Sequence, residues 1–180
     1  MKREATISPC GSYRYDLTRT VEPGCPCVRC DSSSYARSLF APNLFPYVLW
    51  VLCNPSMADA EIDDATERRG WGFTSSWGYP KMVFVNTNPY RSTNPRQART
   101  PGRLITDHNE GFLIRHALEA SLIICAWGTN AESNLACNAE YAMRLAGAGS
   151  KIHTLGLTKG GVPKHPLYLS KDTEPQLWKL

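Results

Sequence analysis

The sequence predicts an α/β fold in three α/β/α layers around a central, mainly parallel sheet of four strands. Four short apolar runs are separated by stretches of helical length, which is the pattern of strand–helix–strand units. The runs are continuous rather than alternating, as expected of strands that are covered on both faces. Each run ends in a polar or glycine-containing tip, and open α/β sheets bind ligands at these carboxyl ends. The four runs are residues 47–53, 82–86, 121–127 and 151–155.

The length and composition predict a single globular domain. The 180 residues form one domain, 1–180, with a Cys-, Ser- and Pro-rich loop or insertion at 22–34. A hydrophobic fraction of 42% argues against a disordered chain. No apolar run approaches the roughly 20 residues of a membrane span, and no apolar segment follows the basic residues 1–5 as in a signal peptide. We therefore expect a cytoplasmic monomer without a membrane partner.

The elements before the second apolar run follow from local patterns. Residues 13–21 alternate between aromatic or aliphatic and polar side chains, which predicts a half-buried strand. An acidic, helix-prone stretch at 57–69 follows the first apolar run, with Asp63 and Asp64 as candidate caps. We expect residues 70–73, with Gly70 and Gly72, either to break that helix or to start a second turn.

The second half of the chain predicts two longer helices and a final loop. Residues 88–104 are rich in Pro, Arg and Asn, which indicates a long loop. Thr106 is placed to cap a helix that ends near Ala120, and a second helix spans 132–146 before Gly147. A Gly- and Pro-rich loop at 156–166 precedes a short terminal helix at 175–180.

The cysteines near the N-terminus raise the question of a metal. Cys25, Cys27 and Cys30 are closely spaced, with Cys10 upstream, and such thiolates can bind zinc or an iron–sulfur cluster. No matching Cys or His pair follows downstream, so the usual split zinc frame is missing. We expect a reduced surface loop and no required cofactor, with a metal at these four cysteines as the alternative.

Three polar side chains at strand ends are the strongest candidates for chemistry. Asn54 follows the first apolar run and could orient a water or a substrate atom, although Asn-Pro-Ser also initiates turns. Asn86 ends the second run, and its amide suits the edge of a nucleobase or serves as a strand cap. His165 lies in the last loop, either as an exposed histidine or as a donor to developing negative charge.

Four motifs, in order, resemble those of the uracil-DNA glycosylase superfamily. Residues 53–56 (Cys-Asn-Pro-Ser) resemble the Gly-Ile-Asn-Pro-Gly loop of that superfamily, and residues 84–87 (Phe-Val-Asn-Thr) resemble its Leu-Leu-Asn-Thr. Residues 125–128 (Cys-Ala-Trp-Gly) are similar to Leu-Leu-Trp-Gly, and residues 165–170 share the first two and last two positions of His-Pro-Ser-Pro-Leu-Ser. The chain also resembles, over about residues 12–170, the bacterial and phage proteins grouped as DUF1643, a family of unknown function.

The glycosylase resemblance implies a fold, a reaction and a set of roles. It implies a uracil-DNA glycosylase-like fold and a hydrolase that flips uracil or a modified pyrimidine out of DNA and breaks its N-glycosidic bond. The usual water-activating Asp is absent at position 54, so a neighbouring carboxylate is expected to supply its charge. The implied catalytic residues are Asn54, His165, Asp63 and Asp64. The implied base-binding residues are Asn86, Trp71, Phe73 and Ser56. The implied DNA-binding residues are Lys159, Lys164, Leu167, Tyr168 and Arg91, with Leu167 or Tyr168 as the wedge in the duplex.

Three other classes of function stay open from the sequence. A DNA- or nucleotide-binding module without catalysis would keep the same cavity, and Asn54 in place of Asp favours it. An enzyme acting on a free modified nucleoside or nucleotide would show no salt-dependent affinity for DNA. A metal-dependent structural domain would be organised around Cys10 to Cys30. The net charge of +4 permits a DNA partner without requiring one.

Overall fold

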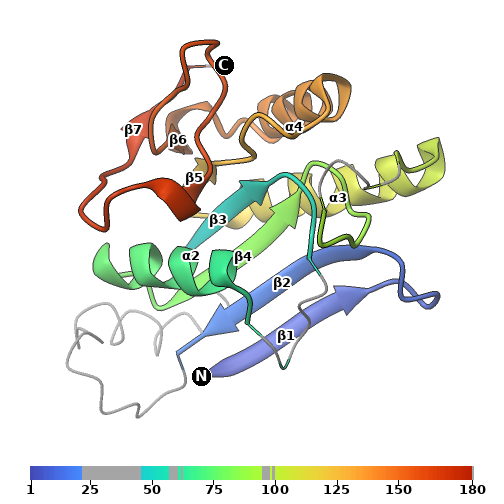
Figure 1. Ribbon diagram of the computed structural model, residues 1–180, viewed down its shortest axis with the longest axis horizontal. Coiled ribbons are helices and arrows are strands. Elements are labelled where there is room, and N and C mark those ends of the chain that lie inside the picture. The colour runs from blue at the N-terminus through green and yellow to red at the C-terminus, as the bar shows by residue number, and fades with distance from the viewer. Residues whose placement is uncertain (22–45, 57–60, 62, 95–97, 99, 180) are drawn as a thin grey trace.

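The computed structural model describes residues 1–21, 46–56, 61, 63–94, 98 and 100–179. It is an α/β fold with one mixed sheet of seven strands in the order β1-β2-β4-β3-β5-β6-β7 (Figure 1). The strands are β1 (Lys2–Ile7), β2 (Arg14–Thr20), β3 (Tyr47–Leu52), β4 (Lys81–Asn86), β5 (Leu122–Cys125), β6 (Ile152–Thr154) and β7 (Gln176–Leu177). The α-helices in the described part are α2 (Ala65–Ser76), α3 (Arg103–Glu119) and α4 (Ser133–Leu145), with 3-10 turns η2 (Gly149–Lys151) and η3 (Pro166–Tyr168). None of these helices is long and apolar enough to cross a membrane.

The four apolar runs of the sequence form the parallel centre of the sheet. β4, β3, β5 and β6 are neighbours and run parallel, as their continuous apolar character predicts. The expected sheet of four strands is too small, because antiparallel β2 and β1 extend it on the β4 side and β7 on the β6 side. β1 is mostly exposed and polar, which explains why no hydrophobic pattern predicted it.

The C-terminal segment is a strand and not the expected helix. Gln176 and Leu177 pair antiparallel with β6, and the Trp178 N–H donates to the Ile152 carbonyl at 2.9 Å. The indole of Trp178 lies 5.6 Å from that of Trp127. These contacts with the rest of the molecule fix the extended conformation, which local propensity alone could not indicate.

Helix α2 runs through Gly70 and Gly72 as one helix, so the expected break at residues 70–73 is absent. Asp64 is its N-cap, as predicted, and forms a reciprocal capping box with Glu67. Gly70 is required by packing, because a Cβ there would lie 2.5 Å from Cζ of Phe84. The glycine therefore lets the helix approach β4 closely, and that contact outweighs its poor helix propensity.

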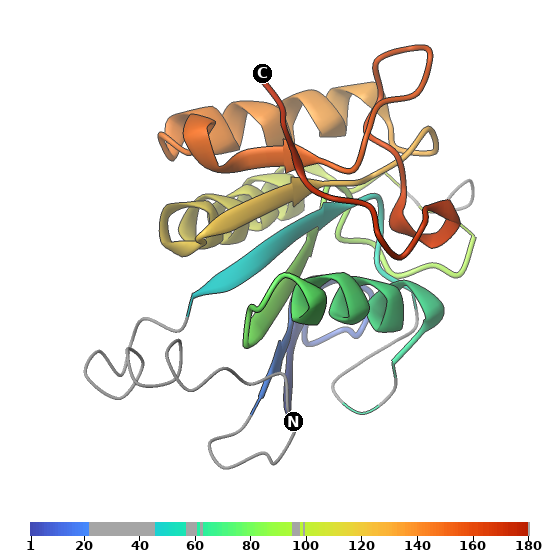
Figure 2. The same cartoon turned by 90° about the vertical axis from the view of Figure 1, so that its left-hand side faces the viewer.

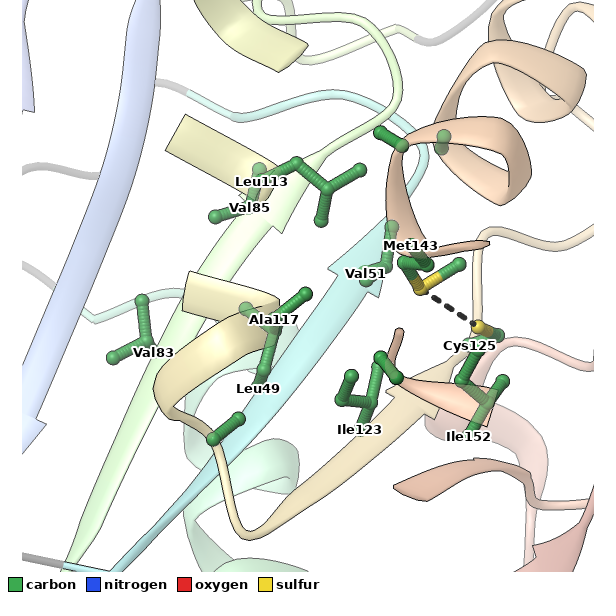
Figure 3. Packing of buried hydrophobic residues seen from close by; sticks show 14 of the residues in the cluster. Leu49, Val51, Val83, Val85, Leu113, Ala117, Ile123, Cys125, Met143 and Ile152 are labelled. Carbon is green, nitrogen blue, oxygen red and sulfur yellow. Dashed lines mark hydrogen bonds between the residues drawn. The ribbon is translucent and has the colours of Figure 1, made fainter. Parts of the chain in front are cut away.

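Alternate side chains of the central strands belong to two buried clusters. Along β3, Leu49 and Val51 pack with residues of α3 and α4, whereas Val48 and Trp50 pack with residues of α2. Figure 2 shows the three helices around the sheet, and Figure 3 shows the first cluster from close by. The Trp50 indole N–H donates to the Thr74 hydroxyl at 3.0 Å, which satisfies the buried polar atom of that ring.

A buried polar network connects β2 to α3 at the end of the sheet where β3 begins. His116 Nε2 lies 3.0 Å from an oxygen of Asp16, and its Nδ1 lies 3.2 Å from the Tyr47 hydroxyl. Burial raises the pKa of Asp16, but the hydrogen bonds from His116 and Thr6 outweigh it, so this pKa is lowered overall. Tyr47 begins β3, so the network lies away from the carboxyl ends of the parallel strands.

Candidate functional site

The carboxyl ends of the central strands enclose one cavity. Because β3, β4, β5 and β6 are parallel, the segments that follow them meet at the same edge of the sheet. A cavity of about 710 Å³ lies there. Its lining includes Asn54 from the loop after β3, Asn86 from the end of β4 and His165 from the loop after β6. The structure thus brings together the three side chains that the sequence singled out.

Asn86 forms the most deeply buried polar part of the cavity wall. Only 1% of the residue is exposed, and neither Nδ2 nor Oδ1 has a hydrogen-bond partner among the described residues. Its backbone carbonyl accepts a hydrogen bond of 2.8 Å from Nδ2 of Asn109, which fixes the strand end. Phe84 lies two residues earlier on the same face of β4 and also lines the cavity. Nδ2 and Oδ1 of Asn86 can therefore bind one acceptor and one donor of a ligand in the cavity.

The side chain of Asn54 uses its Nδ2 to join two loops and leaves its Oδ1 able to accept a hydrogen bond. Its Nδ2 donates to the carbonyls of Pro55 at 3.1 Å and Ser92 at 2.9 Å, which joins two loops. Its Oδ1 is buried in the cavity wall without a hydrogen-bond partner in the described part of the chain. Asn54 can therefore accept a hydrogen bond from a water or a ligand, while its amide nitrogen is already engaged.

His165 follows a loop that is fixed by one hydrogen bond within itself and one to the segment after β5. The Lys164 N–H donates to the Gly156 carbonyl at 2.9 Å, and the Gly128 N–H donates to the Pro163 carbonyl at 3.0 Å. His165 Nδ1 accepts the N–H of Leu167 at 3.5 Å, so in the neutral ring the proton lies on Nε2. Burial lowers the pKa of His165, and this favours the neutral imidazole with Nε2–H as donor.

Gly128 makes room for this histidine. Its φ of +70° lies in the left-handed region, and a Cβ there would lie 3.3 Å from Cβ of His165. A side chain at this position would both strain the backbone and crowd the imidazole. The glycine that follows Trp127 is therefore explained by the approach of the last loop to the end of β5.

The structure distinguishes the two neighbouring aspartates. Asp64 lines the cavity, and its carboxylate accepts the Glu67 N–H at 2.8 Å. Asp63 is not part of the lining; it forms ion pairs with Arg19 at 2.8 Å and Arg3 at 3.2 Å. Of the two candidate carboxylates, Asp64 is the one that a ligand in the cavity can reach.

The comparisons with known proteins identify the family of the chain. The family model described as "Protein of unknown function (DUF1643)" matches residues 36–167, which is well over half of the sequence. The chain belongs to the DUF1643 family. No curated protein and no solved structure matches it. The matched range contains Asn54, Asn86 and His165, so most of the lining of this DUF1643 cavity falls within the family segment; Arg14, Tyr168 and Leu169 lie outside it.

The aromatic side chains of the DUF1643 cavity differ from those expected. Phe73 is 2% exposed and packs against Trp50 and Trp77, and neither Phe73 nor Trp71 lines the cavity. Phe73 belongs to the buried cluster between α2 and the sheet, and Trp71 is partly buried against the same cluster. Phe84 and Trp127 line the cavity instead. The spacing of Phe84 two residues before Asn86 could have indicated this, because alternate residues of a strand share a face.

The predicted DNA contacts divide into two groups. Lys164, Leu167 and Tyr168 line the cavity, and Tyr168 is 90% exposed, so η3 forms part of the rim. Arg69 of α2 donates to the Pro166 and Leu169 carbonyls, which holds η3 against that helix. Lys159 and Arg91 are not part of the lining, and Arg91 donates to the Gly11 carbonyl at 3.2 Å. Ser56, which was expected near the base, lines the cavity as well.

A buried ion pair in the wall was not foreseen from the sequence. Arg14 Nη1 lies 3.0 Å from Oε1 of Glu67, and both residues line the cavity. Burial raises the pKa of the Glu67 carboxyl, with the Arg14 guanidinium opposing it. The position of Glu67 three residues after Asp64 fits a capping box, but nothing in the sequence indicates that Arg14 reaches it.

The cysteines do not supply a metal site within the described residues. Cys10 is exposed, and Cys25, Cys27 and Cys30 lie outside the described part with the rest of loop 22–34. No group of three His, Cys, Asp or Glu side chains in that part is arranged to hold a metal ion. Cys53 lines the cavity, but burial raises the pKa of its thiol to about 11, so it is not a thiolate nucleophile at neutral pH.

Proposed function

We propose that this DUF1643 protein hydrolyses the N-glycosidic bond of uracil or a modified pyrimidine in DNA, on a three-layer fold like that of the uracil-DNA glycosylase superfamily. The observation that carries the proposal is the unpartnered amide of Asn86, buried in the cavity wall beside Phe84. A buried polar group left unpaired costs about 1–3 kcal/mol, so a ligand that pairs with it gains that energy. A pyrimidine edge offers the required adjacent donor and acceptor.

The reaction assigns a separate task to each side chain. The base lies against Phe84 with its edge paired to Asn86, and the C1′–N bond breaks with oxocarbenium character. The bonding electrons stay on the base, and His165 Nε2–H donates a hydrogen bond to the developing anion. Water held by Asn54 Oδ1 attacks C1′ and gives its proton to Asp64. The free base then takes a proton from solvent.

The rim of the cavity supports a polymeric substrate. The ammonium group of Lys164 has no carboxylate partner in the described part of the chain and is placed to bind a phosphate. Leu167 and Tyr168 project from η3 as apolar side chains that can fill the space left by a flipped nucleotide. Lys159 and Arg91, away from the lining, provide further phosphate contacts in this proposal.

The size of the cavity favours a second candidate. About 710 Å³ is in the range of sites that enclose a whole small ligand, roughly 300–1,000 Å³. A free modified nucleoside or nucleotide would therefore fit as a substrate of the same residues. Such an enzyme would act on monomers, and its affinity would depend weakly on salt, unlike that of a protein that binds a DNA backbone.

Cleavage assays on DNA and on monomers test the proposal. Purified protein is incubated with oligonucleotides that carry uracil, hydroxymethyluracil or other altered pyrimidines, and with the matching nucleosides and nucleotides. We expect abasic product from at least one oligonucleotide, and rates lowered by at least about tenfold in His165→Ala and Asn54→Ala. His153→Ala is the matched control, because that histidine belongs to β6 but does not line the cavity. Folded protein that releases no base from any substrate would refute the proposal.

A further inference from the structure

Arg14, Glu67 and Asp64 form a continuous chain of hydrogen bonds along the cavity wall. The Arg14 guanidinium donates to Oε1 of Glu67 at 3.0 Å, and the Asp64 N–H donates to Oε2 of Glu67 at 2.9 Å. The Glu67 N–H returns a hydrogen bond of 2.8 Å to Oδ1 of Asp64. All three residues line the cavity. Both oxygens of Glu67 thus accept hydrogen bonds from the protein. In Asp64 only Oδ1 takes part in this series of hydrogen bonds, and Oδ2 does not.

Helix capping alone does not explain this arrangement. A capping box needs only the N-cap residue and the Glu three positions later, and it works at an exposed helix end. Here the side chains of Arg14 and Glu67 are 3% and 1% exposed, and Arg14 comes from β2, 53 residues away in the sequence. Because the desolvation of a buried ion pair can exceed its attraction, such a pair is weak evidence for stability. Its clear structural effect is to fix the N-terminus of α2 against β2.

The fixed helix end determines where the Asp64 carboxylate lies. Asp64 is the N-cap of α2, so its side chain belongs to the part of the helix that Glu67 and Arg14 hold. Asp64 and His165 both line the cavity, so a ligand bound there can lie between the two side chains. Asn54, at the loop after β3, has no charge with which to accept a proton from water. Among the described residues that line the cavity, the carboxylates are those of Asp64 and Glu67, and both oxygens of Glu67 are already engaged.

We propose that Arg14 and Glu67 are positioning residues that hold the Asp64 carboxylate as the proton acceptor for the attacking water. This inference rests on the proposed function. The water oxygen bonds to C1′ as the C1′–N bond breaks, the electron pair leaves with the base, and the proton of the water passes to Asp64 and then to solvent. The same carboxylate also stabilises the positive charge that develops on the sugar.

The charge of the transition state provides a readout other than turnover. The probes are two single-stranded oligonucleotides, one with a pyrrolidine in place of the sugar, which is cationic at neutral pH, and one with an uncharged tetrahydrofuran. Their affinities are measured by fluorescence anisotropy in the presence of free uracil. We expect the wild-type protein to prefer the cation by at least about tenfold, since transition-state analogues bind about 10²-fold or more tighter than substrates. Partial unfolding would lower both affinities and leave their ratio unchanged.

Point variants show which residues cause the preference for the cationic oligonucleotide. We expect Asp64→Asn and Glu67→Gln to lose most of the preference for the cation, and Arg14→Lys, which keeps the charge of the pair, to retain part of it. Asp63→Asn is the matched control and should keep the full preference, because Asp63 lies outside the lining. A loss in Asp63→Asn as large as in Asp64→Asn, or an unchanged preference in Glu67→Gln, would overturn the inference.

The wild-type result separates this inference from the proposed function. Release of base from DNA together with equal affinity for the two probes would overturn the role of Asp64, Glu67 and Arg14 and leave the glycosylase proposal standing. No release of base and no binding of either probe would overturn both. Release of base with a preference that depends on Asp64 and Glu67 would support both.

Discussion

Replacing Asn86 by Leu should stabilise the protein while it removes ligand binding. Two polar atoms of this side chain are buried without a partner among the described residues, and each such atom costs about 1–3 kcal/mol. Leu resembles Asn in shape and removes both penalties, but it must fit beside Phe84, and overpacking costs about 1–3 kcal/mol. We therefore expect the free energy of unfolding to rise by about 1–3 kcal/mol in Asn86→Leu.

Urea unfolding followed by circular dichroism measures this change. The slope m should stay unchanged, so that the shift in midpoint reports stability alone. Asn109→Leu is the matched control, because Asn109 donates a hydrogen bond of 2.8 Å to the Asn86 carbonyl. That variant should show no such gain, because removing the unpaired Oδ1 of Asn109 is offset by the loss of this donor to the Asn86 carbonyl. A decrease of more than about 1 kcal/mol in Asn86→Leu would refute the reasoning, because the amide would then stabilise the fold.

Three further predictions follow from the packing and charge of the same region. Gly70→Ala should lower the free energy of unfolding by about 1–3 kcal/mol, seen as a lower midpoint of thermal unfolding, because its Cβ would lie 2.5 Å from Phe84. Gly72→Ala, in the same helix with nothing within 4 Å, should instead raise stability by about 0.5–1 kcal/mol; the same sign in both variants would contradict the packing argument. Gly128→Ala should cost about 1–2 kcal/mol from its φ of +70° and should weaken uracil binding in calorimetry, whereas unchanged binding would show that His165 is not displaced. Burial lowers the pKa of His165, so the linked stability is present above the usual pKa of 6.5 and is lost as the pH falls through the lower folded value. Urea unfolding at about pH 7.5 and 5.5 should therefore show a larger acid loss for the wild-type protein than for His165→Gln, and equal losses would mean that His165 is not desolvated.

The central part of the fold could be predicted because its signals are local. Each parallel strand is a continuous apolar run, and the pattern marked residues 47–53 and 82–86 within a residue or two of β3 and β4. The edge strands β1 and β7 gave no such signal, because one is exposed and polar and the other is fixed by Trp178. Strands that depend on pairing with distant segments have no periodicity of their own to detect.

The candidate site was predictable to a similar extent. Asn54 follows one apolar run, Asn86 ends the next, and His165 lies in the loop after the last. Parallel strands place their carboxyl ends at one edge, so the gathering of these residues in one cavity follows from topology. The partner of Glu67 was not predictable, because Arg14 reaches it from β2 through tertiary packing. The aromatic surface was assigned to α2 rather than to Phe84, because the sequence does not say which face of a helix turns toward the sheet.

A crystal structure with a trapped substrate tests the central claim most directly. The ligand is an oligonucleotide that carries 2′-fluoroarabinouridine, since the electron-withdrawing fluorine slows the breaking of the C1′–N bond through an oxocarbenium-like transition state. We expect the uracil ring inside the cavity against Phe84, with Nδ2 and Oδ1 of Asn86 at about 2.7–3.2 Å from its edge and Asp64 facing C1′. Uracil bound elsewhere, or in the cavity without a hydrogen bond to Asn86, would contradict the proposal.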